Sequence, residues 1–141
     1  MKLAIKALTQ SDLSFFKVHL KYSKQKAINL NSDIFIEKFY PHLQGAMRHI
    51  KVSLTVFGPG GRGPHRLTRK ILYTAGGKNW RLNGEFIHDP EGETGRYDKL
   101  VEGDLALFGF DGIDEPDSAI MVLVSSQEDP ALFAGAHLRK L

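Results

Sequence analysis

The sequence predicts a mainly β protein with six or seven strands and two or three short helices. Apolar and polar residues alternate over residues 50–56, which is the pattern of a strand with one buried face. Two nearly continuous apolar runs, residues 105–110 and 119–124, predict a central hairpin. A closed or half-closed barrel leaves few free strand edges and is therefore the expected arrangement. With 141 residues, the chain is expected to form a single domain over residues 1–141.

In the first part of the chain, short strands and helices are expected to alternate. Residues 2–9 alternate weakly as a strand, and Thr9 or Ser11 can cap a helix that runs to residue 20. Residues 27–30 alternate as another strand. The polar cluster after them opens a short helix that Pro41 ends.

In the second part, paired strands are expected to be joined by glycine-rich turns. Residues 58–64 contain four glycines and two prolines and are expected to form a mobile loop. Residues 67–73 alternate as a strand with Arg69 and Ile71 on one face. Residues 79–83 predict a further short strand, followed by a turn. A final short helix is expected to begin at residues 129–130 and to end at Gly135.

Composition excludes several classes of protein. The chain contains no cysteine, which excludes disulfides, thiol nucleophiles and cysteine-ligated zinc. No apolar run approaches the roughly 20 residues that a membrane helix needs, and the first residues lack the pattern of a signal peptide. We therefore expect a cytoplasmic protein with no membrane partner.

Charge is distributed unevenly along the chain, although the net charge is only +3. Residues 1–88 contain 15 Lys or Arg against 4 Asp or Glu, a net charge of +11. Residues 89–141 contain 4 against 12, a net charge of −8. Because phosphates are attracted by local positive potential, a basic first part is typical of a surface that binds a polyanion.

No catalytic or cofactor-binding motif is recognised. The spacing of Gly58, Gly60 and Gly63 matches the dinucleotide fingerprint, but Pro64 follows and no helix opens there. The six histidines are scattered, so no metal site is predicted. The acidic residues between the two apolar runs lack the glycine and final glutamate of a calcium loop. We therefore expect no cofactor and no catalysis by this chain alone.

Two polar segments contain residue types that read the edges of bases. Arginine and lysine donate to guanine, whereas asparagine and glutamine form paired hydrogen bonds with adenine. We name these segments the first arm (residues 21–26 together with Asn29) and the second arm (residues 78–83). The candidate DNA-binding residues of the first arm are Ser23, Lys24, Gln25, Lys26 and Asn29, and those of the second are Lys78, Asn79, Trp80, Arg81 and Asn83.

Further basic residues lie in or beside the glycine-rich loop. Arg62, His65, Arg66, Arg69 and Lys70 suit phosphates, which position a protein on DNA without specifying sequence. Trp80 has two interpretations, since it can face the groove of DNA or hold the second arm against the core.

Residues 24–41 (KQKAINLNSDIFIEKFYP) resemble the opening of the N-terminal recognition domain of EcoRII-type restriction endonucleases. That family shows a polar arm, a short strand, and a helix that ends near an aromatic residue and a proline. Residues 77–81 (GKNWR) resemble its second arm. Residues 100–110 are similar to the signature of the plant B-three domains, which share that fold.

The resemblance implies a seven-stranded DNA-binding pseudobarrel that grips duplex DNA with two arms in the major groove. By position, the two arms above match the arms of the family. The restriction enzymes carry their nuclease in a separate domain, so the resemblance implies a non-catalytic recognition module of a type II restriction endonuclease, with a nuclease domain or subunit as a further partner. The alternative is a non-catalytic β-barrel protein-interaction module that uses the acidic C-terminal half.

Overall fold

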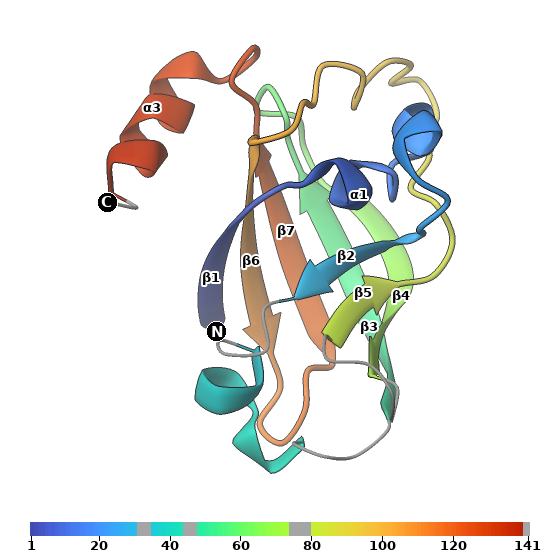
Figure 1. Ribbon diagram of the computed structural model, residues 1–141, viewed down its shortest axis with the longest axis vertical. Coiled ribbons are helices and arrows are strands. Elements are labelled where there is room, and N and C mark those ends of the chain that lie inside the picture. Colours follow the sequence, from blue (N-terminus) through green and yellow to red (C-terminus); the bar gives the residue numbers. More distant parts are fainter. Residues whose placement is uncertain (31–34, 44–47, 74–79, 140–141) are drawn as a thin grey trace.

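Seven strands form one mixed, curled sheet in the computed structural model, which describes residues 1–30, 35–43, 48–73 and 80–139 (Figure 1). The order of the strands is β1-β6-β7-β3-β4-β5-β2, and all pairs are antiparallel except β3 with β7. The strands are β1 (Lys2–Ala7), β2 (Ala27–Leu30), β3 (Arg48–Phe57), β4 (His65–Tyr73), β5 (Trp80–Asn83), β6 (Leu105–Asp111) and β7 (Ser118–Val124). The prediction of a mainly β half-barrel is confirmed.

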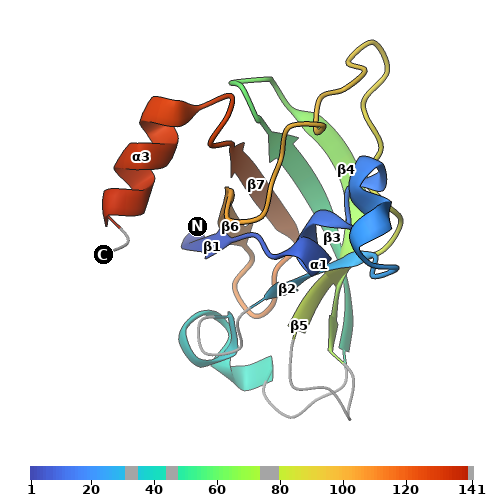
Figure 2. The same ribbon diagram turned by 45° about the horizontal axis from the view of Figure 1, so that its top comes forward.

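The helices are short and lie at the ends of the sheet. They are α1 (Gln10–Leu13), the 3-10 helix η1 (Lys17–Tyr22), the π-helix η2 (Phe35–Phe39), the 3-10 helix η3 (Pro41–Leu43) and α3 (Pro130–Arg139). In Figures 1 and 2, α3 stands beside β1 and away from the other helices. Within the described part of the chain, no helix is long and apolar enough to cross a membrane.

Two helices differ from the sequence prediction. The helix expected to run to residue 20 is interrupted, because Phe16 forms a bridge to Ile87 between α1 and η1. The backbone N–H of Lys17 donates to the carbonyl of Ile87 (2.9 Å), and the backbone N–H of Ile87 donates to the carbonyl of Phe15 (2.8 Å). The last helix continues through Gly135 instead of ending there, since one glycine costs a helix only about 1 kcal/mol.

A buried aromatic cluster fills the interior of the half-barrel. The ring of Phe35 lies 5.2 Å from that of Trp80 and 5.3 Å from that of Phe110. Tyr73 stacks on Trp80 at 5.0 Å. These rings come from η2, β4, β5 and β6, so the cluster joins segments that are far apart in the chain. Aromatic contacts of this kind stabilise the core beyond the effect of buried area alone.

The carboxylate of Asp12 in α1 joins the two edge strands, β1 and β2. It lies 2.9 Å from the ammonium group of Lys6 on β1 and accepts a hydrogen bond from the backbone N–H of Asn29 on β2 (3.1 Å). Lys6 also donates to the backbone carbonyl of Asn29. The side chain of Asp12 is fully buried and also completes a capping box with Thr9. These bonds link the two ends of the sheet and hold it curled.

Buried Arg96 anchors the glycine-rich loop between β3 and β4. Its guanidinium donates to the backbone carbonyls of Val56 (3.1 Å), Gly58 (3.0 Å) and Gly63 (2.7 Å). The backbone N–H of Gly60 donates to both carboxylate oxygens of Asp129 (3.1 and 3.0 Å). Because both its ends and its middle are hydrogen-bonded, this loop is an anchored connection rather than the mobile one that its composition predicts.

The first testable prediction concerns the bridge between the edge strands. Replacing Asp12 by Asn leaves the ammonium group of Lys6 without its counter-ion and places an amide against a backbone N–H. We expect Asp12→Asn to lower the free energy of unfolding by about 2–4 kcal/mol, measured by urea denaturation. Asp114→Asn is the control, because Asp114 is exposed in the connection between β6 and β7. Equal stability of the two variants would contradict a closing role for Asp12.

Candidate nucleic-acid interface

Polar side chains form a row across β3, β4 and β5 on the outer face of the sheet. Lys51 is paired with Lys70, and Lys70 with Asn83. Directly paired residues of antiparallel strands project from the same face. Both lysines are exposed and Asn83 is half-buried, whereas the next row on the inner face is apolar and buried. That inner row consists of Ile50, Ile71, Leu82 and Ile28.

A second outer row lies one step further along the same strands. His49 is paired with Leu72, Leu72 with Arg81, and Arg81 with Asn29 of the first arm. His49 and Arg81 are exposed, and Asn29 is half-buried. The side-chain oxygen of Asn29 is buried without a hydrogen-bond partner among the described residues. The register of β2 with β5 therefore places members of both arms side by side.

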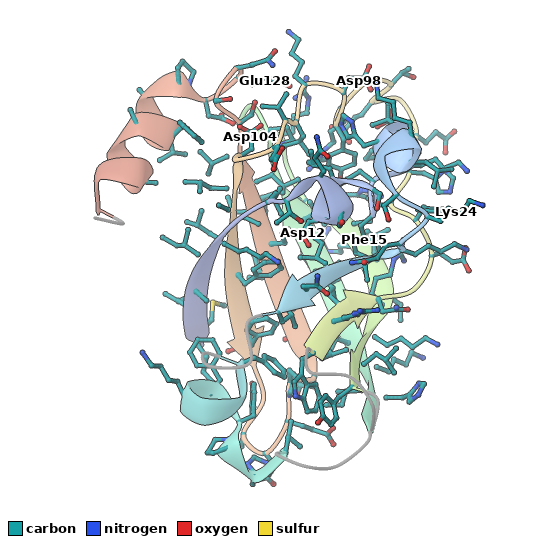
Figure 3. All side chains as sticks on the ribbon, viewed as in Figure 1. Asp12, Phe15, Lys24, Asp98, Asp104 and Glu128 are labelled. Atoms are coloured by element: carbon teal, nitrogen blue, oxygen red, sulfur yellow. The ribbon has the colours of Figure 1, made fainter. Side chains whose placement is uncertain are left out.

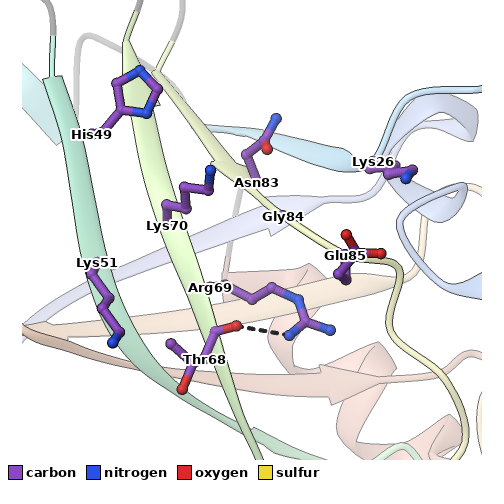
Figure 4. A pocket seen from close by; sticks show the side chains of 9 residues that line it. All are labelled: Lys26, His49, Lys51, Thr68, Arg69, Lys70, Asn83, Gly84 and Glu85. Carbon is purple, nitrogen blue, oxygen red and sulfur yellow. Dashed lines mark hydrogen bonds between the residues drawn. The ribbon is translucent and has the colours of Figure 1, made fainter.

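An open groove of about 640 Å³ connects these rows with the first arm (Figure 4). Figure 4 shows Lys26 facing Asn83 across it, with Lys70 and Lys51 beyond. The residues that line the groove are Lys26, His49, Lys51, Thr68, Arg69, Lys70, Asn83, Gly84 and Glu85. Only one of them is acidic, so the groove carries a positive electrostatic potential that favours anionic ligands.

The first arm exposes its lysines and turns its glutamine toward its own backbone. Lys24 and Lys26 are exposed, and Ser23 and Gln25 are half-buried (Figure 3 labels Lys24). The hydroxyl of Ser23 accepts a hydrogen bond from the backbone N–H of Gln25. The side-chain amide of Gln25 donates to the carbonyl of Ala27 (3.3 Å). The hydroxyl of Ser14 donates to the carbonyl of Gln25 (2.7 Å), which fastens this arm to α1.

Two ammonium groups share one aromatic ring beside the groove. The ammonium of Lys26 lies 4.9 Å from the centre of the Phe86 ring, and that of Lys17 lies 5.0 Å from it. Each cation is attracted by the ring, but the two repel each other. This contact holds the cation of the first arm at the edge of the groove and adds Lys17 to the basic surface.

Trp80 lies in the core, which corrects its assignment as a DNA-binding residue. Its side chain is 2% exposed and packs against Phe35 and Tyr73. The alternation of β5 explains this placement, since Trp80 and Leu82 face inward while Arg81 faces outward. Trp80 therefore holds the second arm against the barrel, which is the other interpretation that the sequence allowed.

Arg62, which the sequence predicts to contact phosphates, is half-buried and forms an ion pair with Glu128. Its guanidinium lies 2.8 Å from the carboxylate of Glu128 and donates to the carbonyl of Pro59 (2.8 Å). Arg62 lies in the loop between the last residue of β3 and the first residue of β4. This end of the hairpin is remote from the two outer rows. A nine-residue strand such as β4 is about 30 Å long, so Arg62 lies far from the end of β4 that leads to the second arm.

Arg69 lines the groove, and its guanidinium is hydrogen-bonded to backbone carbonyls of the protein. Its guanidinium donates to the carbonyls of Thr68 (2.8 Å) and Phe86 (3.0 Å), while its Nε is buried without a partner among the described residues. Burial lowers the pKa of Arg69 from its usual range, and the carboxylate of Glu85 opposes that shift. A Cβ atom on Gly84 would lie 2.9 Å from the Cδ of Arg69, so glycine suits this close packing.

The remaining candidates divide between the outer face and the segments that are not described. Arg66 is exposed on the outer face of β4. Lys78 and Asn79 lie outside the described residues. Sequence reasoning missed Lys51 and His49, and it gave Arg69 and Lys70 the same role. The alternation of both strands was the available signal, because it puts Arg69 on the inner face and Lys70 on the outer one.

Among the described residues, no group of three or more histidine, aspartate and glutamate side chains could hold a metal ion. His65, beside the glycine-rich loop, lies 2.8 Å from the hydroxyl of Tyr97. Burial and the charge of Arg96 lower the pKa of His65, so its imidazole is neutral at pH 7 and adds no charge to the basic surface.

No protein-family model, curated protein or solved structure matches this chain. Its function therefore has to be inferred from the geometry of the interface.

The second testable prediction uses the only tryptophan of the chain as a probe. Because Trp80 is buried among aromatic rings, we expect blue-shifted fluorescence that is insensitive to iodide and moves to longer wavelength only on unfolding. Addition of DNA is expected to leave the emission nearly unchanged. Strong quenching of the folded protein by iodide, or by DNA with protection from iodide, would place Trp80 in the groove instead.

Proposed function

We propose that this chain binds duplex DNA in a sequence-specific way and without catalysis, through the outer face of β2, β5, β4 and β3. The observation that supports this most strongly is the alignment of the two outer rows with the first arm around one basic groove. Together they bring Lys26, Lys51, Lys70 and Arg81 onto the same side of the sheet as Asn29 and Asn83.

The mixture of side chains favours readout of sequence over simple attraction to charge. Lysines at the groove suit phosphates, which contribute affinity but carry no sequence information. Arg81 and Asn83, on β5, suit guanine and adenine edges respectively. Asn29 lies directly opposite Arg81 on β2, so a base pair in front of β5 would meet polar side chains from both arms.

Duplex DNA is preferred to a single strand because the described aromatic side chains near the groove are occupied. Binding to single strands relies on exposed rings that stack on bases. Trp80 and Tyr73 stack on each other, and the ring of Phe86 is covered by two lysines. The face therefore offers hydrogen-bonding groups and charge, which suit the major groove of a duplex.

The resemblance to EcoRII-type recognition domains and to plant B-three domains supports the same function at the level of the family. A seven-stranded curled sheet with short helices is compatible with their pseudobarrel. On this proposal, the chain is the recognition module of a type II restriction endonuclease, and a separate domain or subunit cuts the DNA.

The third testable prediction is that the chain selects one short duplex from a random library, with affinity that falls steeply as salt rises. Arg81→Ala combined with Asn83→Ala should reduce the preference for the selected duplex over a scrambled one by about 2–6 kcal/mol, from two base contacts of about 1–3 kcal/mol each. Affinities are measured by fluorescence anisotropy at several salt concentrations.

Lys99→Ala is the matched control, because Lys99 is an exposed cation in the connection between β5 and β6. It should leave the preference unchanged. Equal affinity of the wild-type protein for every duplex would contradict sequence-specific binding, and cleavage of DNA by the purified chain with magnesium would contradict a non-catalytic role.

A further inference from the structure

We infer that the outer face of the β3–β4 hairpin binds successive phosphates of one DNA strand as a three-rung ladder. This inference rests on the proposed function and adds the path of the DNA backbone, including residues that neither arm contains. It follows from the register of the hairpin, from the spacing of its outward side chains, and from a pair of lysines that face each other.

Three of the outward pairs of the hairpin form the rungs, and every side chain in these three pairs can donate hydrogen bonds. The rungs are Thr55 with Arg66, Ser53 with Thr68, and Lys51 with Lys70. All are exposed except Thr55, which is half-buried. No carboxylate interrupts these rungs, so the ladder presents hydroxyl, guanidinium and ammonium donors only. Donors of these types supply most phosphate contacts in complexes of proteins with DNA.

The spacing of the rungs matches a DNA backbone. Outward residues alternate along a strand, so neighbouring rungs are about 6.8 Å apart. This separation is close to that between successive phosphates on one strand of a duplex. The Arg66 rung and the Lys70 rung are therefore two phosphate steps apart, with the Thr68 rung at the phosphate between them.

The lysine rung indicates that an anion belongs at this position. Lys51 and Lys70 are directly opposite on paired strands, where two like charges destabilise a sheet. Neither lysine takes part in the ion pairs formed among the described residues. The one acidic residue of the groove, Glu85, interacts electrostatically with the half-buried side chain of Arg69. A phosphate between the two ammonium groups would replace their repulsion by two attractive contacts.

The ladder has a defined orientation relative to the base-reading residues. Lys70 is paired with Asn83 on its other side, and the neighbouring Leu72 is paired with Arg81. The lysine rung is thus the end nearest to the residues that read bases, and the Arg66 rung is the remote end. A strand that follows the ladder runs from the recognised base pairs toward the glycine-rich loop.

The experiment compares ethylation interference on the selected duplex for the wild-type protein and for two variants. With the wild type, we expect ethylation of three successive phosphates on one strand to block binding. Lys51→Gln with Lys70→Gln should abolish interference at the phosphate nearest the recognised bases. Arg66→Gln should abolish it two phosphates away and leave the first intact.

The salt dependence of binding gives a second, independent readout. The slope of log K against log salt should decrease by about 2 for the double lysine variant and by about 1 for Arg66→Gln. Both variants should keep the preference for the selected duplex. Lys51→Arg with Lys70→Arg should restore the wild-type slope, and Lys99→Ala should not change it.

The outcomes separate this inference from the proposed function. Specific binding by the wild type, with interference and slope unchanged in both variants, would overturn the ladder alone. If both variants lost interference at the same phosphate, the ladder would also be overturned, because its rungs would not contact successive phosphates of one strand. Failure of the wild-type protein to bind any duplex at low salt would overturn the proposed function and the ladder together.

Discussion

The curled shape of this sheet depends most on the bonds that the buried carboxylate of Asp12 forms with Lys6 and with the backbone of Asn29. An open seven-stranded sheet has two edges, and here they belong to β1 and β2. Asp12 binds the Lys6 side chain of one edge and the Asn29 backbone of the other, so one residue of α1 joins the two ends of the sheet. The same contact sets the position of β2, and β2 carries the first arm against β5. The bonds of Asp12 therefore both close the half-barrel and position the strand that borders the basic groove.

The second constraint is the strict alternation of the strands that follow. Because β3, β4 and β5 bury one face, the other face is free to gather polar residues. Burial of Trp80 and Leu82 turns Arg81 outward, and burial of Ile71 turns Lys70 outward. A shift of register by one residue would exchange these sets, placing cations in the core and aromatic rings in solvent. The basic face is thus a consequence of the same packing that holds the half-barrel together.

Most of the strands could be predicted from local pattern, because alternation is a property of neighbouring residues. The parts that could not be predicted depend on residues far apart in the chain. The expected helix after Thr9 is broken by a bridge to Ile87, and Arg62 forms an ion pair with Glu128, 66 residues later. The loop that composition marks as mobile is anchored by Arg96. Of the candidate site, Arg66 and Arg81 are on the outer face and Trp80 is in the core, while the pairing of Lys51 with Lys70 depends on the register of β3 with β4.

The measurement that tests this account most directly is a titration of the isotopically labelled protein with the selected duplex, followed by amide chemical shifts in NMR. The account predicts the largest changes on β2, β3, β4 and β5, at Asn29, Lys51, Lys70 and Arg81, with little change on β1, β6 and β7. Changes concentrated on β1 and β6, or in the acidic connection between β6 and β7, with β2, β3, β4 and β5 unaffected, would contradict it.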